Sequence, residues 1–400
     1  MKTHVLALAV SLLASACVAA PAPDTVVPTT SAAPSVTPAS SVAATSSPAV
    51  SAGSVAYRVV PGVGRAAVSP DGRWIAVTNP QAGHSPFDAV HLFTTDGTPV
   101  RDVTDAGTFW GWLPDSSGLF VATSLPQHAA PLGIIDLDGR VINTELLLSH
   151  PTLSRDGKLI VAEHQEGCCA SVVQREIRVA RRDGGGTRTL VLSESPSGSE
   201  GVVLLGIDVS DRAVYRGGTK VMRISLAGGA ITTRATSPDY ARVIQGNTSP
   251  DGTAIFARGY EPARWYVIGN DRVAAWDDAL GTVVEDGNPG LTKSSATTLW
   301  VGPHTFLARD TSGSLFSVDA LTYVRTPQAG RLVTGDVVLA YQHDTLLVVR
   351  GGVVVLLDTG TGAVRGTGLD LRPHSEGAQA AALPSGGFVL SSSSDTYRID

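Results

Sequence analysis

Histidine and carboxylate side chains recur in the long connecting segments of the chain, where they could build a polar or metal-binding site. Three histidines, His84, His128 and His164, fall in consecutive long loops. The loops expected on the same face also carry Glu166, Tyr260, Glu261, Asp277, Asp278 and His374. Imidazole and carboxylate groups suit transition metals, but no ligand-spacing motif connects these residues. We therefore predict no cofactor and expect these to be solvated loop side chains that do not meet. A metal site on the loop face is the alternative.

A cysteine near the N-terminus could be a site of lipid attachment. Lys2 supplies a short positive region, and Val5 to Leu13 form an apolar stretch of signal-peptide length. The segment Leu13-Ala14-Ser15-Ala16-Cys17 resembles a bacterial lipobox. That resemblance implies a diacylglycerol on the Cys17 sulfur and cleavage directly before Cys17. The alternative is an ordinary secretory signal that contains a cysteine.

Cys168 and Cys169 are the remaining cysteines of the chain, and they are adjacent. Thiols of exported proteins tend to oxidise. Neighbouring Cα atoms lie ~3.8 Å apart, which is shorter than an ordinary disulfide prefers. A vicinal disulfide, a pair of free thiols, and a metal or intermolecular role therefore all stay open.

The segment that follows Cys17 has the composition of a tether. Residues 18–53 are mostly Ala, Pro, Ser, Thr and Val, and Asp24 is their only charge. Such a segment cannot bury enough apolar surface to offset the entropy lost on ordering. We predict a lipoprotein signal peptide at residues 1–16, a disordered tether at 17–54 and a folded body at 55–400.

The body repeats a short turn motif, which determines the fold that we expect. Ser69-Pro70-Asp71-Gly72 and Ser249-Pro250-Asp251-Gly252 are full copies. Pro presets the first corner of a turn, Asp caps it, and Gly accepts positive φ. Related segments occur at 112–122, 153–162, 209–215, 302–308, 342–348 and 383–390. The copies are spaced roughly 40 to 55 residues apart, the length of a four-stranded propeller blade.

The strands of each blade follow from these turns. In the first blade we expect strands at residues 65–69, 73–78, 89–95 and 99–104. A second turn recurs between the third and fourth strands, at residues 95–98, 137–140, 183–186, 227–230 and 359–362. The Ser-Pro-Asp-Gly pattern resembles the WD40-like (PD40) repeats of TolB-type propellers. That resemblance implies a fold and no particular activity.

The fold class predicted is all-β, a β-propeller of eight four-stranded blades, with seven as the alternative. The last blade contains only three strands before the sequence stops at Asp400. A spare strand at Val55 to Val60 precedes the first blade. We expect this N-terminal strand to close the ring, since an open ring would leave exposed sheet edges.

Composition and missing motifs narrow the functional classes. The net charge of -6 argues against a nucleic-acid partner. Gly-x-Ser-x-Gly, His-Glu-x-x-His, Cys-x-x-Cys and nucleotide-binding glycine motifs are absent from the sequence. Propeller active sites are assembled from separate blades, so these absences leave the enzyme question open.

We expect an exported binding or interaction module, lipid-anchored to the outer side of the cytoplasmic membrane or to an outer membrane. Its expected partners are the membrane itself and an envelope protein or glycan. The alternative is a propeller hydrolase, lactonase or lyase with its site at the channel mouth. Long B–C and D–A loops, at residues 79–88, 124–131, 164–172, 194–201, 277–294 and 371–377, favour their face for binding.

Overall fold

The structure is a computed structural model, and it describes the following segments of the chain. These are residues 51–52, 56–60, 65–78, 90–103, 108–122, 131–147, 151–166, 173–195, 201–259, 264–269, 273–276, 281–286, 297–372, 378–392 and 395–400. The chain divides into two compact units, Met1–Ser47 and Pro48–Asp400. All described residues belong to the second unit.

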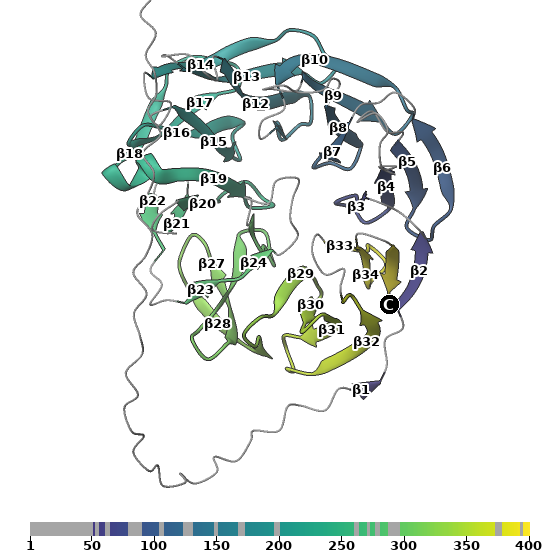
Figure 1. The fold of residues 1–400 in the computed structure, drawn as a ribbon. Coiled ribbons are helices and arrows are strands. Elements are labelled where there is room, and N and C mark those ends of the chain that lie inside the picture. Colours follow the sequence, from purple (N-terminus) through teal and green to yellow (C-terminus); the bar gives the residue numbers. More distant parts are fainter. Residues whose placement is uncertain are drawn as a thin grey trace, which may run out of the picture. The chain divides into compact units, whose positions relative to one another are not determined.

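Eight antiparallel sheets follow one another along the chain and stand around an axis as the blades of a propeller (Figure 1). Strands A to D of each blade run outward from that axis. Blade one has β3 (Arg65–Val68), β4 (Trp74–Thr78), β5 (Val90–Thr94) and β6 (Pro99–Val103). Blade two has β7 (Thr108–Trp112), β8 (Gly118–Ala122), β9 (Pro131–Asp136) and β10 (Val141–Leu147). Blade three has β11 (Thr152–Leu153), β12 (Leu159–Glu166), β13 (Val173–Arg181) and β14 (Arg188–Ser195). Blade four has β15 (Val202–Ile207), β16 (Arg212–Gly217), β17 (Lys220–Ser225) and β18 (Thr232–Thr236).

The second half of the ring has the same plan. A 3-10 helix, η1 (Pro238–Arg242), leads into blade five. Blade five has β19 (Val243–Thr248), β20 (Ile255–Gly259), β21 (Trp265–Ile268) and β22 (Val273–Ala275). Blade six has β23 (Thr282–Val283), β26 (Thr305–Arg309), β27 (Ser314–Asp319) and β28 (Arg325–Arg331). Blade seven has β29 (Val337–Gln342), β30 (Thr345–Arg350), β31 (Val353–Asp358) and β32 (Val364–Asp370). Blade eight has β33 (Gln379–Ala382), β34 (Phe388–Ser391), β35 (Thr396–Ile399) and β2 (Ala56–Val60).

The ring is closed by the N-terminal strand, which confirms the prediction. Strand β2 is the outer strand of blade eight and pairs antiparallel with β35, with Ala56 opposite Ile399. The first and last strands of the propeller therefore share one sheet, and β35 has no open edge. The blade count of eight is also confirmed.

Two segments differ from the sequence prediction. Ser51 and Ala52 fall inside the predicted tether, yet they form β1 (Ser51–Ala52), which runs parallel to β32. The long loop predicted at residues 277–294 is interrupted by β23 and by β24 (Glu285–Asp286), which pairs with β25 (Thr297–Thr298). These strands are two residues long, too short to show the apolar alternation by which strands are recognised.

The core lies between neighbouring blades. The central strands of a blade are covered on both faces, so their sequences are nearly continuous apolar runs. In β30 the four residues from Leu346 to Val349 are buried, and in β31 so are those from Val354 to Leu357. Separate apolar clusters fill the gaps between blades three and four and between blades seven and eight.

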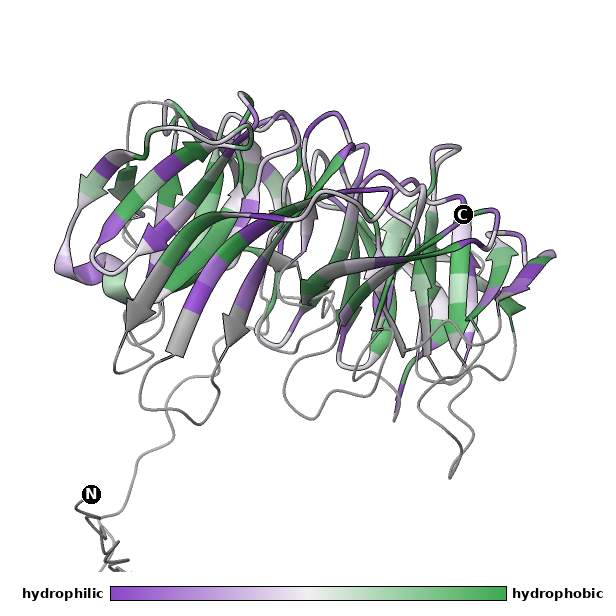
Figure 2. Cartoon of the chain, turned by 90° about the horizontal axis from the view of Figure 1, so that it is seen from above, coloured by the Kyte–Doolittle hydropathy of each residue, from purple (hydrophilic) through white to green (hydrophobic). Residues whose placement is uncertain are grey.

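The A–B and C–D connections lie together on one face of the propeller, which we call the turn face (Figure 2). Its A–B turns include residues 69–73, 113–117, 154–158, 208–211 and 249–254, and the C terminus lies on the same face. Most residues of the long B–C and D–A loops lie outside the described part of the chain.

Candidate functional site

The repeated turn motif builds the inner rim of the turn face. In blade five the Ser249 hydroxyl donates to an Asp251 carboxylate oxygen (2.8 Å) and accepts from the Ala254 backbone N–H (3.0 Å). Gly252 closes the turn with a φ of +74°. The Ser–Asp contact recurs in blade one (2.6 Å) and in blade three (2.7 Å). Each of these carboxylates therefore supports its own turn.

Blades two and four lack the turn glycine, and the side chains that replace it connect blades. Ser116 and Asp211 take the left-handed conformation, with φ of 60° and 51°. The Ser116 Oγ accepts from the backbone N–H of Asp71 in blade one (2.9 Å). The Asp211 carboxylate accepts from the backbone N–H of Arg155 in blade three (2.8 Å). The departures from the repeat thus hold neighbouring turns together around the channel mouth.

A cavity of about 410 Å³ opens at this mouth between the inner strands of blades two to five. Its lining comprises Pro114 and Asp115, residues 152–157, Ile207 and residues 248–250. A second cavity of about 370 Å³ adjoins it and shares Pro114, Thr152 and Thr248 with the first. Volumes of this order suit a small molecule.

The carboxylates of the mouth are ionised and already engaged. Asp115 forms an ion pair with Arg182 (2.7 Å) and accepts from Ser117. Burial acts to raise the pKa of Asp115, but these hydrogen bonds and this ion pair outweigh it and keep the pKa below its usual value. The Ser154 hydroxyl and the Lys158 backbone N–H lower the pKa of Asp156 to about 2. A general acid needs a pKa near the working pH, so neither carboxylate is suited to that role.

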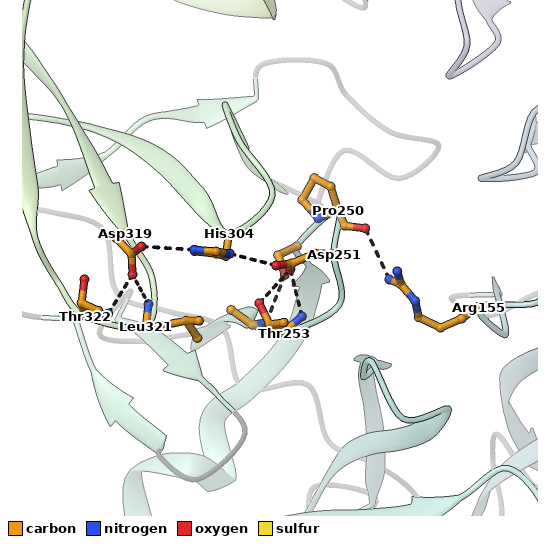
Figure 3. A network of polar contacts seen from close by, with 10 residues as sticks. Arg155, Pro250, Asp251, Thr253, His304, Asp319, Leu321 and Thr322 are labelled. Atoms are coloured by element: carbon orange, nitrogen blue, oxygen red, sulfur yellow. Dashed lines mark hydrogen bonds and ion pairs between the residues drawn. The ribbon is translucent and has the colours of Figure 1, made fainter.

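Among the described residues that line the mouth cavity, Arg155 is the only one with a cationic side chain. Its Nη1 donates to the backbone carbonyl of Pro250 (3.3 Å), so the side chain extends from blade three to blade five (Figure 3). Gly252 makes room for it, since a Cβ at that position would lie 2.6 Å from Nη1. The guanidinium is therefore held beside the cavity by the turns of two blades.

A charged triad lies on the same face between blades five and six (Figure 3). His304 Nδ1 is 2.8 Å from Asp251 Oδ2, and Nε2 is 3.2 Å from Asp319 Oδ2. The hydrogen bond to Asp251 raises the pKa of His304, and the charge of Asp319 adds to this effect. Two carboxylates can only accept, so the ring satisfies both when each nitrogen carries a proton. The triad links two blades and was not predicted from the sequence.

The predicted loop-face residues are described only in part. His164 and Glu166 were predicted in a B–C loop, but β12 continues through both because β13 pairs with it as far as Gln174. His164 is buried, with 6% exposure, and lies opposite Glu176 in the sheet. The other predicted site residues lie outside the described part of the chain: Cys17, His84, His128, Cys168, Cys169, Tyr260, Glu261, Asp277, Asp278 and His374.

Two features are absent from the described residues. These residues contain no group of three or more His, Cys, Asp or Glu side chains that could hold a metal ion. Over the same segments, none of the helices has the length and apolar character needed to cross a membrane.

Comparison with known proteins yields likenesses among solved structures and none among protein families or curated sequences. No protein-family model matches the chain, and no curated protein matches it. Among solved structures the chain is similar to apo AztD from Citrobacter koseri, with 12% identity and a TM-score of 0.46. The alignment covers 78% of this chain and 87% of AztD. This likeness carries no argument about function.

Proposed function

We propose that this chain is a binding module that takes a ligand into the channel cavity of its turn face. The observation that carries the proposal is the mouth cavity between blades two and five, with Arg155 on its rim. Four separate blades contribute to the lining, so its shape depends on the closed ring. Binding residues are often presented in this way by a rigid scaffold.

The electrostatics of the mouth favour binding over catalysis. Asp115 and Asp156 are ionised and hydrogen-bonded within their turns. General acid–base chemistry calls for a titratable group with a pKa near the working pH, and neither of these carboxylates offers one. The lining can instead offer hydrogen bonds, a positive charge and an apolar wall.

We further propose that the module is exported and anchored by lipid on Cys17, as a member of the TolB-type propeller group. The support is the lipobox-like segment, the tether composition and the Ser-Pro-Asp-Gly repeats. An anchor of this kind would keep the propeller at the outer side of a membrane, where its partner would be a component of the cell envelope. The loop-rich face stays a second predicted surface.

A ligand-observed NMR screen of a general fragment library tests the binding proposal. We expect several fragments to bind the full chain and to lose binding when Thr152→Trp fills the region common to both cavities. The matched control is Thr232→Trp, on the outer strand β18 of blade four, which should leave fragment binding intact. An unchanged melting temperature would establish that both variants are folded. Fragments that bind Thr152→Trp as well as the parent, or no fragment binding at all, would refute the proposal.

A further inference from the structure

We propose that the mouth cavity recognises a small organic anion, whose carboxylate or phosphate group pairs with Arg155. This inference rests on the proposed function and names the chemical class of its ligand. It starts from the charges of the lining, which are unequal once the existing ion pairs are taken into account.

The two acidic side chains of the lining already have cationic partners. Asp115 is paired with Arg182 (2.7 Å), and Asp156 is paired with Lys158 (3.2 Å). Arg155 has no carboxylate partner among the described residues; its guanidinium donates to a neutral carbonyl. Among the described charged side chains of the lining, the Arg155 guanidinium is therefore the one without an oppositely charged partner; the nearby Asp211 carboxylate accepts from the Arg155 backbone N–H.

The position of Arg155 suits a bound anion. One donor, Nη1, is used on Pro250, and the main chain of Arg155 is fixed by Asp211. Guanidinium groups pair with carboxylate and phosphate through two parallel N–H donors. Because the side chain is held at both ends, less conformational entropy is lost when a ligand binds.

The other lining residues indicate the chemistry of the rest of the ligand, beyond its anionic group. Thr152 and Thr248 line both cavities and carry hydroxyls, while Pro114 and Ile207 contribute apolar surface. A compact, hydroxyl-bearing anion fits this mixture better than a long apolar chain. A hydroxylated monocarboxylate is therefore the simplest probe, and its neutral analogue tests the charge.

Isothermal titration calorimetry with gluconate, inorganic phosphate and neutral glucose tests this inference on the full chain. We expect gluconate and phosphate to bind saturably, and Arg155→Gln to weaken both by at least about tenfold, as expected for a lost charged hydrogen bond. Glucose should not distinguish the variant from the parent. Arg188→Gln is the matched control, since that arginine donates to the Leu226 carbonyl away from the cavity lining.

The possible outcomes separate this inference from the proposed function. If neither anion saturates the protein, or if Arg155→Gln binds both as tightly as the parent, the inference is wrong. Fragment binding that is blocked by Thr152→Trp would then still support the cavity as a ligand site. If Thr152→Trp leaves fragment binding unchanged, both proposals fall together.

Discussion

Asp251 is hydrogen-bonded through both carboxylate oxygens, and each oxygen serves a different blade. Oδ1 accepts from Ser249 and from the Thr253 backbone within its own turn, and Oδ2 faces His304. These contacts hold the pKa of Asp251 well below its usual value, even though burial acts to raise it. A residue that the sequence marks as a turn former therefore also connects blades five and six.

The His304 contacts predict a pH-dependent contribution to stability. The pKa of His304 is raised above its usual 6.5, chiefly by Asp251. The stabilisation that protonated His304 contributes should be complete below about pH 6.5. It should be lost as the pH rises through the raised pKa that His304 has in the folded protein. We expect the melting-temperature gap between the parent and His304→Gln to be larger at about pH 5.5 than at about pH 9.

Asp319→Asn provides the control for this pH dependence. This substitution removes one charged acceptor and leaves the contact between the His304 ring and Asp251 in place. In the Asp319→Asn background, the melting-temperature difference caused by His304→Gln should therefore vary less with pH. A gap between parent and His304→Gln that stays constant from acid to alkaline pH would contradict the assignment.

The sequence predicted few of the site residues because the mouth has no local signature. Thr152 and Arg155 belong to blade three and Thr248 belongs to blade five, so the two sides of the cavity are brought together only by the ring. His304 lies in a repeat copy that the sequence analysis recognised as a turn anchor, but its two carboxylate partners are 53 and 15 residues away. Loop length directed attention to the opposite face instead.

At the level of strands, the turn chemistry was highly predictive. The four strands of blade one begin and end within one residue of the expected positions. The predicted C–D turns at residues 95–98 and 359–362 also connect strands as expected. Pro, Asp and Gly impose these turns by local geometry, which sequence alone reveals.

Prediction of strands from the turn motif failed in blade six, because the A–B connection of that blade lacks the full motif. Gly302-Pro303-His304 has no Asp in the capping position, and the chain forms the β24–β25 pair before it enters β26. Such a detour is determined by packing against neighbouring blades, so the local pattern could not predict it.

Gly72 should be needed for more than its turn. Its φ is +66°, and a Cβ there would lie 2.2 Å from the carbonyl oxygen of Ala382 in blade eight. Gly218 has a similar φ of +57° but no atom within 4 Å of a Cβ. We expect Gly218→Ala to cost about 1 kcal/mol of unfolding free energy and Gly72→Ala about 1–3 kcal/mol more.

Urea denaturation of both glycine variants measures this difference directly, since the backbone penalty is common to the two. Equal losses would indicate that blades eight and one are free to separate at Gly72, contrary to the observed contact.

For the whole molecule, ring closure by β2 should contribute strongly to stability. Deleting residues 55–60 removes the partner of β35 and exposes a sheet edge. We expect a clear fall in melting temperature and more aggregation. Deleting residues 20–50 should change the melting temperature little, because that range ends before β1. The closure account would be wrong if the two deletions had the same effect.

Membrane attachment is a separate property of the whole chain. If Cys17 carries lipid, Cys17→Ala should move the protein from the membrane fraction to the soluble fraction of the producing cells. Ser15→Ala, two residues before Cys17, should remain in the membrane fraction. Mass spectrometry of the N-terminal peptide identifies the acyl group, and membrane association that persists without one would contradict lipid anchoring.

The central claim is that the ligand binds at the mouth of the channel on the turn face. A crystal structure of the Cys17→Ala chain grown with gluconate tests it most directly. We predict gluconate between blades two and five, with its carboxylate on the Arg155 guanidinium. Gluconate bound instead among the B–C and D–A loops, or absent from the mouth cavity at a saturating concentration, would contradict the account.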